Sequence, residues 1–373
     1  MKKRIWNILS IALFGAALLA VPVGWLCNAG KTFSESERRY LAELPKLSKQ
    51  SLSDWTFDDA TETYLADHLP LRDALVGVNA YATLASGRQV STDVWADDEG
   101  YLLEAPVRKD SAEIQKRMKR IAALAETTGV PTYVLAVPSA GYIRRSHLPG
   151  ALAALYKDDA ILGEIAASET VTFVPLLDRF EREGQGWYYR TDHHWTADGA
   201  FAAYEAFAAA SGRTALSKDA FYHHSVNGYY GSTRSRSALW LTAPDTLRID
   251  EPIGADVTVS FSDSDTTSDR LFFYEHLGEY DWYPLFLDGN HAITVIENHA
   301  APEDAGTLLM VKDSFGNTLA PLLVSSYRSV VMVDPRYCRE SVSQLCKTIG
   351  ADEILFCYSL ERIATDLNLL RLK

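Results

Sequence analysis

The stretch Leu308-Leu309-Met310-Val311-Lys312-Asp313-Ser314-Phe315-Gly316-Asn317 joins an apolar run to a polar turn. Its apolar residues do not alternate with polar ones, which is typical of a strand buried on both faces of a parallel sheet. Ser314 follows this strand and precedes a helical pattern. Because open α/β sheets bind ligands at the carboxyl ends of their strands, the stretch predicts both a fold class and a candidate site.

Apolar strands alternate with helical patterns over most of the chain after Pro106. The predicted strands are Thr132–Val137, Val171–Leu176, Thr307–Val311, Ser329–Val333 and Ile354–Cys357. The predicted helices are Ser111–Thr128, Ala151–Ala167, Ala197–Ala210, Phe315–Ser325 and Ser341–Ile349. Unalternating strands separated by helices predict a three-layer α/β fold, in which helices cover both faces of a parallel sheet.

The alternation of apolar strands with helical patterns stops between about Ser217 and Ala301. Short alternating segments such as Asp256–Phe261 predict a β-rich insertion there. Three aspartates in the region lack the glycine and the distal glutamate of a calcium-binding loop, so a solvated turn is the favoured interpretation. They are Asp263, Asp265 and Asp269.

The first 30 residues predict a membrane anchor. Three basic residues, Lys2, Lys3 and Arg4, precede 26 residues without a charge, from Ile5 to Gly30. About 20 apolar residues cross a bilayer as a helix, and the basic flank stays in the cytoplasm, which leaves the rest of the chain outside. A cleaved signal peptide is the alternative, but the apolar run is long for a signal sequence and lacks a small-residue cleavage site. We therefore expect an uncleaved single-pass anchor in the cell membrane.

Residues 31–105 predict a juxtamembrane segment that packs on the main domain, which comprises residues 106–373 with the insertion at about 217–301. Two short amphipathic helices, Phe57–Ala66 and Arg72–Leu84, fall in this segment. His68 and Arg72, at the junction of these helices, can reach a functional site, but a local cap or ion pair is the favoured interpretation.

The chain is acidic, with 36 basic and 49 acidic residues and a net charge of −13. Without the three basic residues that flank the anchor, the net charge is −16. No basic stripe is visible, which argues against nucleic acid as a partner. Such an ectodomain is soluble and is not attracted to an anionic lipid surface.

Four cysteines do not make a disulfide scaffold in a chain of 373 residues. Cys27 lies in the predicted anchor, which leaves Cys338, Cys346 and Cys357 as an odd set in an oxidising compartment. Cys338 and Cys346 are candidates for one disulfide, although sequence does not decide its geometry. No pair or cluster has zinc-binding spacing, so we predict neither a metal nor another cofactor.

A second stretch, Asp192-His193-His194-Trp195, is rich in reactive side chains. It places an acid, two imidazoles and an indole in consecutive positions. In an extended loop, residues two positions apart point the same way. Asp192 can therefore accept a hydrogen bond from His194, which fixes the tautomer and leaves the other ring nitrogen as a base. Ser314 is the candidate nucleophile, and its own N–H, at a helix N-terminus, can help to hold an oxyanion.

Other interpretations of these residues stay open at this point. Asp192, His193 and His194 can form a metal cluster, although a spaced set of further ligands is missing. Asp192 can instead cap the following helix, with His194 packed in the core, and Ser314 can be a simple N-cap. The two segments together, each at the end of a predicted strand, favour a Ser-His-Asp site.

The Asp192-His193-His194-Trp195 block resembles the signature of the DHHW protein family, which is related to the alginate O-acetyltransferase proteins and other SGNH-hydrolase-like acetyltransferases. Further blocks that carry the resemblance are Phe33–Pro45, Asp67–Arg72, Tyr188–Thr196, Gly231-Ser232, Leu287–Asn290 and Lys312–Ser314. In those acetyltransferases a D-x-H-W block supplies the acid and the base, and a later serine is the nucleophile. The resemblance thus implies an SGNH-hydrolase-like fold with Asp192, His194 and Ser314 as the triad.

Two departures from the family pattern affect individual roles. His193 occupies the middle of the block, so an exchange of base between His193 and His194 stays open. Lys312 stands where the Asp-Ser block of the family has a glycine. The remaining site candidates divide into oxyanion donors and substrate contacts. The oxyanion candidates are Gly289, Asn290 and Asn317, of which Gly289 and Asn290 can equally form a tight turn. The candidates for substrate contacts are His193, Tyr189, Arg190 and Trp195, of which Trp195 can form a wall of the site. An aromatic sugar platform or core packing explains Trp187, Tyr188, Tyr189 and Trp195 equally well.

The resemblance implies a membrane-anchored, extracytoplasmic serine O-acetyltransferase or O-acetylesterase that acts on a cell-envelope or secreted polysaccharide through an acetyl-enzyme. It also implies a partner, a membrane-bound O-acyltransferase that delivers the acetyl group. The alternative is a non-catalytic surface protein that binds a glycan or a partner and keeps a relict triad. A metal-dependent hydrolase is a third candidate.

Overall fold

The computed structural model describes residues 2–88 and 93–372. The chain divides into two compact units, one of Met1–Ser91 with Arg234–Leu241 and the other of Thr92–Thr233 with Thr242–Lys373. The larger unit therefore begins before residue 106, where the sequence places the start of the main domain. The reason is a short hairpin, because β3 (Val94–Ala96) pairs with β4 (Leu102–Glu104) within this unit.

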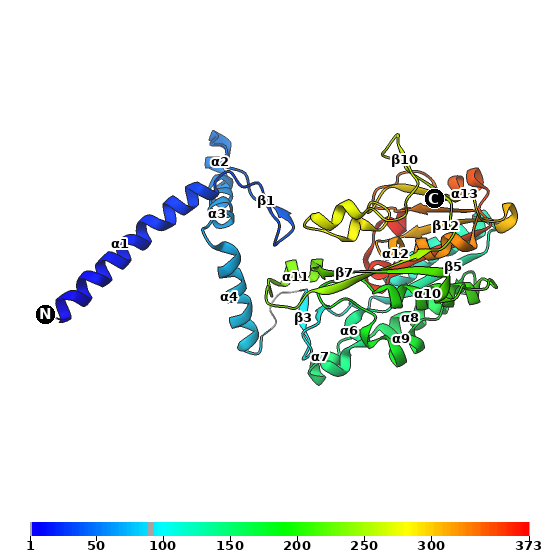
Figure 1. The fold of residues 1–373 in the computed structure, drawn as a ribbon, viewed down its shortest axis with the longest axis horizontal. Coiled ribbons are helices and arrows are strands. Elements are labelled where there is room, and N and C mark those ends of the chain that lie inside the picture. The colour runs from blue at the N-terminus through cyan, green and yellow to red at the C-terminus, as the bar shows by residue number, and fades with distance from the viewer. Residues whose placement is uncertain (1, 89–92, 373) are drawn as a thin grey trace. The chain divides into compact units, whose positions relative to one another are not determined.

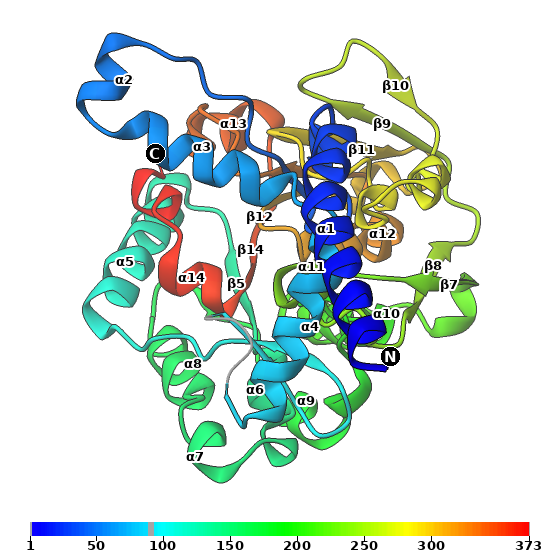
Figure 2. The same ribbon diagram turned by 90° about the vertical axis from the view of Figure 1, so that its left-hand side faces the viewer.

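An eight-stranded sheet forms the centre of the larger unit, in the order β10-β9-β11-β13-β12-β14-β5-β6 (Figure 1). Five neighbouring strands run parallel: β13 (Ser329–Val333), β12 (Thr307–Lys312), β14 (Glu353–Ser359), β5 (Thr132–Val137) and β6 (Thr172–Phe173). Three more extend the sheet in antiparallel pairing: β11 (Ile293–Asn298), β9 (Val257–Phe261) and β10 (Thr267–Ser268). The second half of the predicted insertion is therefore part of the core sheet, as Figure 2 also shows.

Helices cover both faces of this sheet. Because successive residues of a strand point to opposite faces, the residues of β12 divide between two buried clusters. Leu308 and Met310 of β12 belong to one buried cluster, together with residues of α10 (Ala197–Ala210) and α12 (Gly316–Leu323). Leu309 and Val311 belong to a second cluster. Its helices are α5 (Ser111–Thr128), α8 (Asp158–Ala166), α13 (Val342–Ile349) and α14 (Leu360–Thr365). The predicted α/β fold is confirmed, and the antiparallel extension is a feature that the sequence did not predict.

Further helices and strands lie outside the large sheet. The other helices are α1 (Lys2–Asn28), α2 (Lys49–Ser53), α3 (Thr56–Asp67), α4 (Arg72–Ala85), α6 (Ala140–Ile143), α7 (Gly150–Ala153), α9 (Leu177–Glu183) and α11 (Ser232–Ser237). Short 3-10 helices occur at Arg145–His147, Gly184–Gly186, Lys218–Ala220, Tyr274–Gly278, Tyr283–Leu285, Glu303–Ala305, Val324–Ser326 and Asn368–Arg371. The other strands are β1 (Phe33–Ser34), which pairs with β2 (Arg39–Tyr40), and β7 (Phe221–Tyr229), which pairs with β8 (Asp245–Pro252).

The predicted helix Ala151–Ala167 is interrupted, because α7 and α8 are separate helices. Tyr156 lies between them, is buried, and donates a hydrogen bond from its hydroxyl to the carbonyl oxygen of Glu104 at 2.7 Å. Its ring also packs directly against the backbone of Gly141, where a side chain would collide with it. A buried aromatic anchor thus stops the helix.

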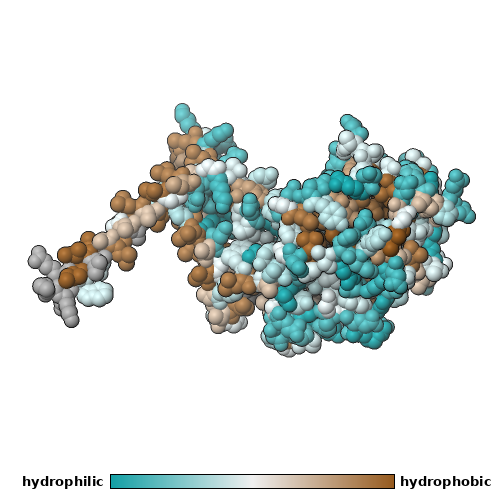
Figure 3. Space-filling view, in the orientation of Figure 1, coloured by the Kyte–Doolittle hydropathy of each residue, from teal (hydrophilic) through white to brown (hydrophobic). Residues whose placement is uncertain are grey.

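In the smaller unit, α1 carries the one helical segment among the described residues that is long and apolar enough to cross a membrane, Ile5–Asn28, with a mean hydropathy of 2.1. Figure 3 shows apolar residues along this helix. Its end is fixed to α3, because Trp25 contacts Tyr64 edge-on at a centroid distance of 5.4 Å. The apolar helix predicted from the sequence is confirmed, and its insertion in a membrane stays a prediction.

His68 and Arg72 make local contacts in the same unit. The two ring nitrogens of His68 form hydrogen bonds with the carbonyl oxygens of Tyr64 and Lys31 at 2.8 and 2.9 Å. Arg72 forms an ion pair with Glu37. These contacts fit the local roles expected for both residues.

All four cysteines, Cys27, Cys338, Cys346 and Cys357, are free thiols in the structure. The candidate disulfide between Cys338 and Cys346 is not formed.

Asp158 is a buried carboxylate at the first turn of α8. Its Oδ2 accepts a hydrogen bond from the backbone N–H of Ser139 at 2.6 Å, whereas its Oδ1 is buried without a hydrogen-bond partner. Burial raises the pKa of this carboxyl to about 6, although the hydrogen bond from Ser139 opposes the shift. Because the folded-state pKa lies above the ordinary value, the ionised form destabilises the folded state.

We expect the substitution Asp158→Asn to stabilise the chain at pH 7.5 and to have little effect near pH 4. The stability associated with protonated Asp158 is present below its unfolded pKa and is lost as the pH rises through about 6. The gain should be on the order of 1–3 kcal/mol, since one pKa unit corresponds to about 1.4 kcal/mol. Thermal unfolding of the full chain in detergent measures it. Asp159→Asn, an exposed neighbour on the same turn, is the matched control, and an equal effect of both substitutions would contradict the assignment.

Candidate active site

The Asp192–His194 segment lies on a tight loop that precedes α10. Tyr188 and Trp195 form an isolated antiparallel bridge across this loop. The N–H of Thr196 also donates to the carbonyl oxygen of Trp187 at 2.8 Å. Trp195 is fully buried, and its indole N–H donates to Oγ1 of Thr318 on α12 at 2.5 Å. The indole therefore fixes the loop to the helix that begins just after Ser314.

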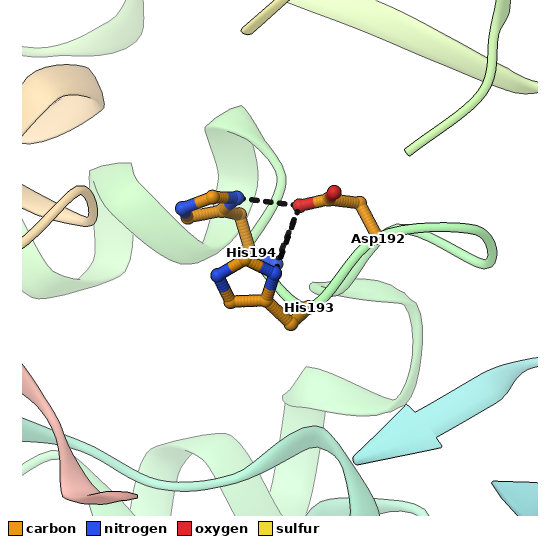
Figure 4. Close-up of side chains that lie close together, drawn as sticks. All are labelled: Asp192, His193 and His194. Carbon is orange, nitrogen blue, oxygen red and sulfur yellow. Dashed lines mark hydrogen bonds and ion pairs between the residues drawn. The ribbon is translucent and has the colours of Figure 1, made fainter. Parts of the chain in front are cut away.

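Asp192 is buried and accepts hydrogen bonds on both of its carboxylate oxygens. Oδ1 lies 2.5 Å from Nδ1 of His194 and 3.0 Å from the backbone nitrogen of the same residue. Oδ2 accepts from the backbone N–H and the hydroxyl of Ser232 at 2.7 and 3.0 Å. Figure 4 shows both imidazoles beside this carboxylate. Asp192 is thus held from two directions.

His194 joins this carboxylate to Ser314. Its Nε2 lies 2.7 Å from Oγ of Ser314, although 120 residues separate the two in the sequence. Because Nδ1 faces Asp192, Nδ1 carries the proton and Nε2 is free to accept one from the Ser314 hydroxyl. The structure therefore brings Asp192, His194 and Ser314 together in one hydrogen-bonded line.

The surroundings keep His194 neutral. Burial lowers the pKa of its imidazole to about 4, and the neighbouring His193 adds to this shift, while Asp192 opposes it. For Asp192, burial acts to raise the pKa, but the two imidazoles and the hydrogen bonds outweigh burial and hold the pKa of its carboxyl well below the usual range. At neutral pH the pair is a carboxylate beside a neutral imidazole, which is the state in which a general base works.

Gly231 allows the backbone near Ser232 to approach Asp192. A Cβ atom at this position would collide with Cβ and Oδ2 of Asp192. The loop that carries Asp192 is held in turn by Asp245, which accepts hydrogen bonds from the backbone N–H groups of Arg190 and Thr191 at 2.7 and 2.8 Å. The absence of a side chain at Gly231 is therefore a requirement of the site geometry.

Ser314 lies two residues after the end of β12, in a turn that Asp313 organises. Oδ1 of Asp313 accepts from the N–H of Phe315 at 2.9 Å, and Oδ2 accepts from the N–H of Ser359 at 2.8 Å. Asp313 thus ties the turn to the end of the neighbouring strand β14, because Ser359 is its last residue. The side chain of Ser314 is left to face His194.

Lys312 lies behind this turn and is buried. Its ammonium donates to Oδ1 of Asn317 at 2.7 Å and to Oδ1 of Asn290 at 2.9 Å, and lies 3.6 Å from Asp334. Burial lowers the pKa of this ammonium to about 8, although Asp334 opposes the shift. The lysine that departs from the family pattern thus joins the nucleophile turn to the loop at Asn290.

The three oxyanion candidates differ in what they can donate. The side-chain amide of Asn317 donates to the carbonyl oxygen of Gly289 at 3.0 Å and to Oδ1 of Asn290 at 3.2 Å. Gly289 has a left-handed backbone, with a φ of +94°. In Asn290 the side-chain oxygen accepts from two groups, so its amide nitrogen points away from them. Asn317 and Gly289 therefore support the loop. The side-chain amide nitrogen of Asn290 points away from Lys312 and Asn317.

His193 lies beside this line of residues. Its Nδ1 is 3.0 Å from the hydroxyl of Ser232 and 3.6 Å from Oδ1 of Asp192. The ring nitrogen at hydrogen-bonding distance from Ser314 belongs to His194. In this arrangement His194 faces the candidate nucleophile. His193 lies beside His194 and helps to lower the pKa of its imidazole.

The aromatic candidates are mostly core residues. Tyr188, Tyr189 and Trp195 are buried and offer no open surface to a sugar. The guanidinium of Arg190 lies over the ring of Tyr101, 5.0 Å from its centroid. These positions agree with the core-packing interpretation of the tyrosines and of Trp195.

Sequence reasoning missed Tyr283, which stacks on His194 with a centroid distance of 3.7 Å and an interplanar angle of 12°. Its hydroxyl donates to the carbonyl oxygen of Ser314 at 3.3 Å, and burial raises its pKa well above the usual value. Tyr283 lies in a stretch without regular periodicity, so no pattern pointed to it. It excludes water from one face of the imidazole.

The separation between the donor atoms of Asp192 and His194 fits a shared hydrogen bond better than it fits two ligands of one metal ion. The donor atoms of Asp192, His193 and His194 lie within 4.8 Å of one another. However, two ligands of a tetrahedral ion at about 2.1 Å are separated by roughly 3.4 Å, whereas Oδ1 of Asp192 and Nδ1 of His194 are 2.5 Å apart. That separation is a hydrogen-bond length.

A comparison with protein families adds an independent finding. Residues 170–333 match the family model described as DHHW protein. The resemblance seen in the sequence block is thereby confirmed, and the match contains Asp192, His194 and Ser314. A comparison with curated protein sequences finds no match.

Solved structures of DHHW and related proteins share the fold. A DHHW family protein from Eubacterium siraeum DSM 15702 superimposes with a TM-score of 0.62 at 20% identity, covering 76% of this chain and 99% of its own. PatB1 from Bacillus cereus superimposes with a TM-score of 0.62 at 21% identity, covering 75% of this chain and 99% of its own, both with and without a sulfonyl adduct. At these identities the similarity establishes the fold alone.

We expect the His194 imidazole to titrate near pH 4 and to keep its proton on Nδ1 at neutral pH. Substitution His193→Gln should raise this pKa, because His193 is one of the groups that lower it. Nitrogen-15 NMR of labelled histidine measures both the tautomer and the pKa. Titration of His194 near the ordinary value of about 6.5, or a proton on Nε2, would contradict this description of the site.

Proposed function

We propose that this chain is a serine-dependent O-acetyltransferase or O-acetylesterase that acts on an extracytoplasmic polysaccharide. One observation carries the proposal, which is the hydrogen-bonded line from Asp192 through His194 to Ser314, with distances of 2.5 and 2.7 Å. A neutral imidazole between a carboxylate and a serine hydroxyl is the arrangement that activates a serine for attack on an acyl carbon.

In the first half-reaction, Nε2 of His194 takes the proton of the Ser314 hydroxyl while Oγ forms a bond to the acyl carbon. The carbonyl electrons move to oxygen and give an oxyanion. When the intermediate collapses, the leaving oxygen takes the proton from His194, and the acyl group stays on Ser314. Asp192 orients the imidazole and stabilises its cationic form during the transfer.

In the second half-reaction, a sugar hydroxyl or water loses its proton to His194 and attacks the acyl carbon. The second intermediate collapses, the Ser314 oxygen leaves, and it regains the proton from His194. A sugar hydroxyl gives the transferase reaction, and water gives the esterase reaction. The same imidazole therefore acts as base and then as acid in both steps.

We assign stabilisation of the oxyanion to the backbone N–H of Ser314 and the side-chain amide of Asn290. Asn317 is a positioning residue, because its side-chain amide donates hydrogen bonds to the carbonyl oxygen of Gly289 and to Oδ1 of Asn290. Lys312 holds the oxygens of both asparagines and thus fixes their orientation.

The acyl group and the substrate class rest on the family. The resemblance of the Asp192–Trp195 block to the O-acetyltransferases related to the DHHW proteins supports an acetyl group on a polysaccharide, and the match of residues 170–333 to the DHHW model supports that resemblance. The sulfonyl adduct of PatB1 supports a test of Ser314 with a sulfonylating reagent, since such reagents modify activated nucleophiles.

The apolar helix α1 supports an extracytoplasmic placement at the membrane. A helix of this length and hydropathy is suited to anchor the chain. An anchored enzyme can receive acetyl groups from a membrane-bound O-acyltransferase, and we propose such a protein as the donor partner.

We expect Ser314→Ala to abolish turnover of an activated acetyl ester and to prevent a covalent adduct with a sulfonyl fluoride. Asp192→Asn should lower kcat/KM by about 10³–10⁴-fold, because the neutral amide neither fixes the tautomer nor stabilises the imidazolium. Ester hydrolysis by the full chain in detergent measures the turnover, and mass spectrometry identifies the modified residue.

Ser225→Ala, an exposed serine on β7, is the matched control for this experiment and should match the wild type. If the wild-type chain forms no adduct and turns over no ester, the enzyme proposal is wrong. A non-catalytic glycan-binding protein with a relict triad is then the better interpretation.

The metal-dependent alternative makes an opposite prediction. If Asp192, His193 and His194 bind a metal ion, a chelator should remove ester turnover and restored metal should return it. We expect turnover to be unchanged by EDTA, because the proposed steps use only the side chains of Asp192, His194 and Ser314. Elemental analysis of the purified chain, run beside the assay, distinguishes a tightly held metal from none.

A further inference from the structure

One helix runs from the larger unit into the smaller one. α11 begins at Ser232, which belongs to the larger unit, whereas the chain from Arg234 to Leu241 belongs to the smaller unit, together with α1, α3 and α4. From Thr242 onward the chain belongs to the larger unit again. The acyl-transfer steps described above give this segment no role.

Trp240 fixes the segment in the smaller unit. Its indole N–H donates to the carbonyl oxygen of Asp73 on α4 at 2.8 Å, and its ring packs on the same helix at Gly77. A Cβ atom at Gly77 would lie 2.6 Å from Cδ1 of the indole, which is closer than nonbonded carbon atoms approach. One turn further along α4, the hydroxyl of Tyr81 accepts from the N–H of Leu241 at 2.8 Å. The missing side chain at Gly77 thus makes the notch that receives the indole.

The chain between Ser232 and Trp240 is a short, internally bonded link. Arg234, the third residue of α11, donates from its guanidinium to the carbonyl oxygen of Trp240 at 2.8 Å. Its own carbonyl oxygen accepts from the N–H of Ala238 at 3.0 Å. Ala238 has a left-handed backbone with a φ of +57°, which costs free energy in a residue other than glycine and persists where the surroundings impose it. These bonds make α11 and Trp240 move together.

The other end of this link holds Asp192. The backbone N–H and the hydroxyl of Ser232 donate to its Oδ2 at 2.7 and 3.0 Å, whereas the hydrogen bonds from His194 reach Oδ1. Ser232 therefore supports the carboxylate from outside its own loop. If these donors move away, Oδ2 is left buried without partners, which is costly, and the carboxylate no longer has a fixed orientation toward the imidazole.

We propose that Trp240 is a positioning residue for the pair of Asp192 and His194, and that its docking on α4 makes the geometry of this pair depend on the smaller unit. The indole holds α11, α11 holds Ser232, and Ser232 holds the carboxylate that orients the imidazole toward Ser314. Because α1 belongs to the same unit as α4, the link joins the predicted membrane anchor to the acid–base pair. The effect on catalysis rests on the proposed function, whereas the effect on the imidazole does not.

Two substitutions in the full chain release the indole in different ways. Trp240→Ala removes the ring, and Gly77→Ala fills the notch while it replaces glycine by a better helix former. With a small activated acetyl ester in detergent, we expect both to lower kcat about tenfold and to change KM by less than about twofold, since the geometry of the acid–base pair matters in the transition state and not in ground-state binding. Steady-state kinetics measures both constants.

Leu241→Ala and Val78→Ala are the matched controls, because each is the exposed neighbour of a substituted residue. Both should match the wild type. Trp240→Phe keeps a ring in the notch and loses only the bond to Asp73, so it should recover most of the kcat that Trp240→Ala loses. A wild-type kcat in both Trp240→Ala and Gly77→Ala would overturn the proposal.

Ser232→Ala distinguishes positioning from a general loss of stability. It removes one of the two donors to Oδ2 of Asp192. We expect it to lower kcat several-fold in the otherwise wild-type chain and by less than about twofold in the Trp240→Ala background, where Ser232 is already displaced. Equal effects in the two backgrounds would show that Trp240 does not act through Ser232, and the proposal would then be wrong.

Nitrogen-15 NMR of labelled histidine tests the same link without turnover. Both Trp240→Ala and Gly77→Ala should give a mixture of His194 tautomers, in place of a proton held on Nδ1, and unchanged signals would contradict the proposal. If the signals change and the wild-type chain turns over no ester, the proposed function is wrong and the positioning role stands. If the ester is turned over and neither the signals nor kcat respond to the substitutions, the positioning role is wrong and the proposed function stands.

Discussion

The carboxylate of Asp192 is the constraint on which the arrangement around Ser314 depends. A buried charge is costly unless hydrogen bonds replace the water it has lost, and Asp192 receives them from His194 and Ser232. Each donor in turn needs a fixed backbone. Gly231 allows the close approach of Ser232, and Asp245 fixes the loop before Asp192. The orientation of His194 toward Ser314 follows from this set.

A second buried charge, Lys312, organises the opposite side of the nucleophile. An ammonium in the interior is tolerated only where acceptors surround it, and here Asn290, Asn317 and Asp334 do so. The cost of burying it is visible in the lowered pKa. In return, one group fixes two loops that come from distant parts of the chain. The position of Ser314 between two satisfied buried charges explains how a short turn keeps a defined geometry.

The sequence predicted the parts of this fold that depend on local pattern. The bounds of α5, α10, β5 and β13 agree with the expected segments because long periodic or wholly apolar runs leave few alternatives. The pairing of Asp192 with His194 was also predictable, since it follows from their spacing. Contacts made across the chain were not. Tyr283 over His194 depends on how distant segments pack, and no local signal encodes that packing.

The antiparallel extension of the sheet shows why the region from 217 to 301 resisted prediction and why it matters. Strand β11 pairs with β13 on one side and with β9 on the other, so the insertion is built onto the core. The segment before β11 must then turn sharply to reach it, and Leu287, Asp288 and Gly289 do this with left-handed backbones. That turn brings Asn290 to Lys312. A strand added at the sheet edge thereby determines a polar group beside the nucleophile.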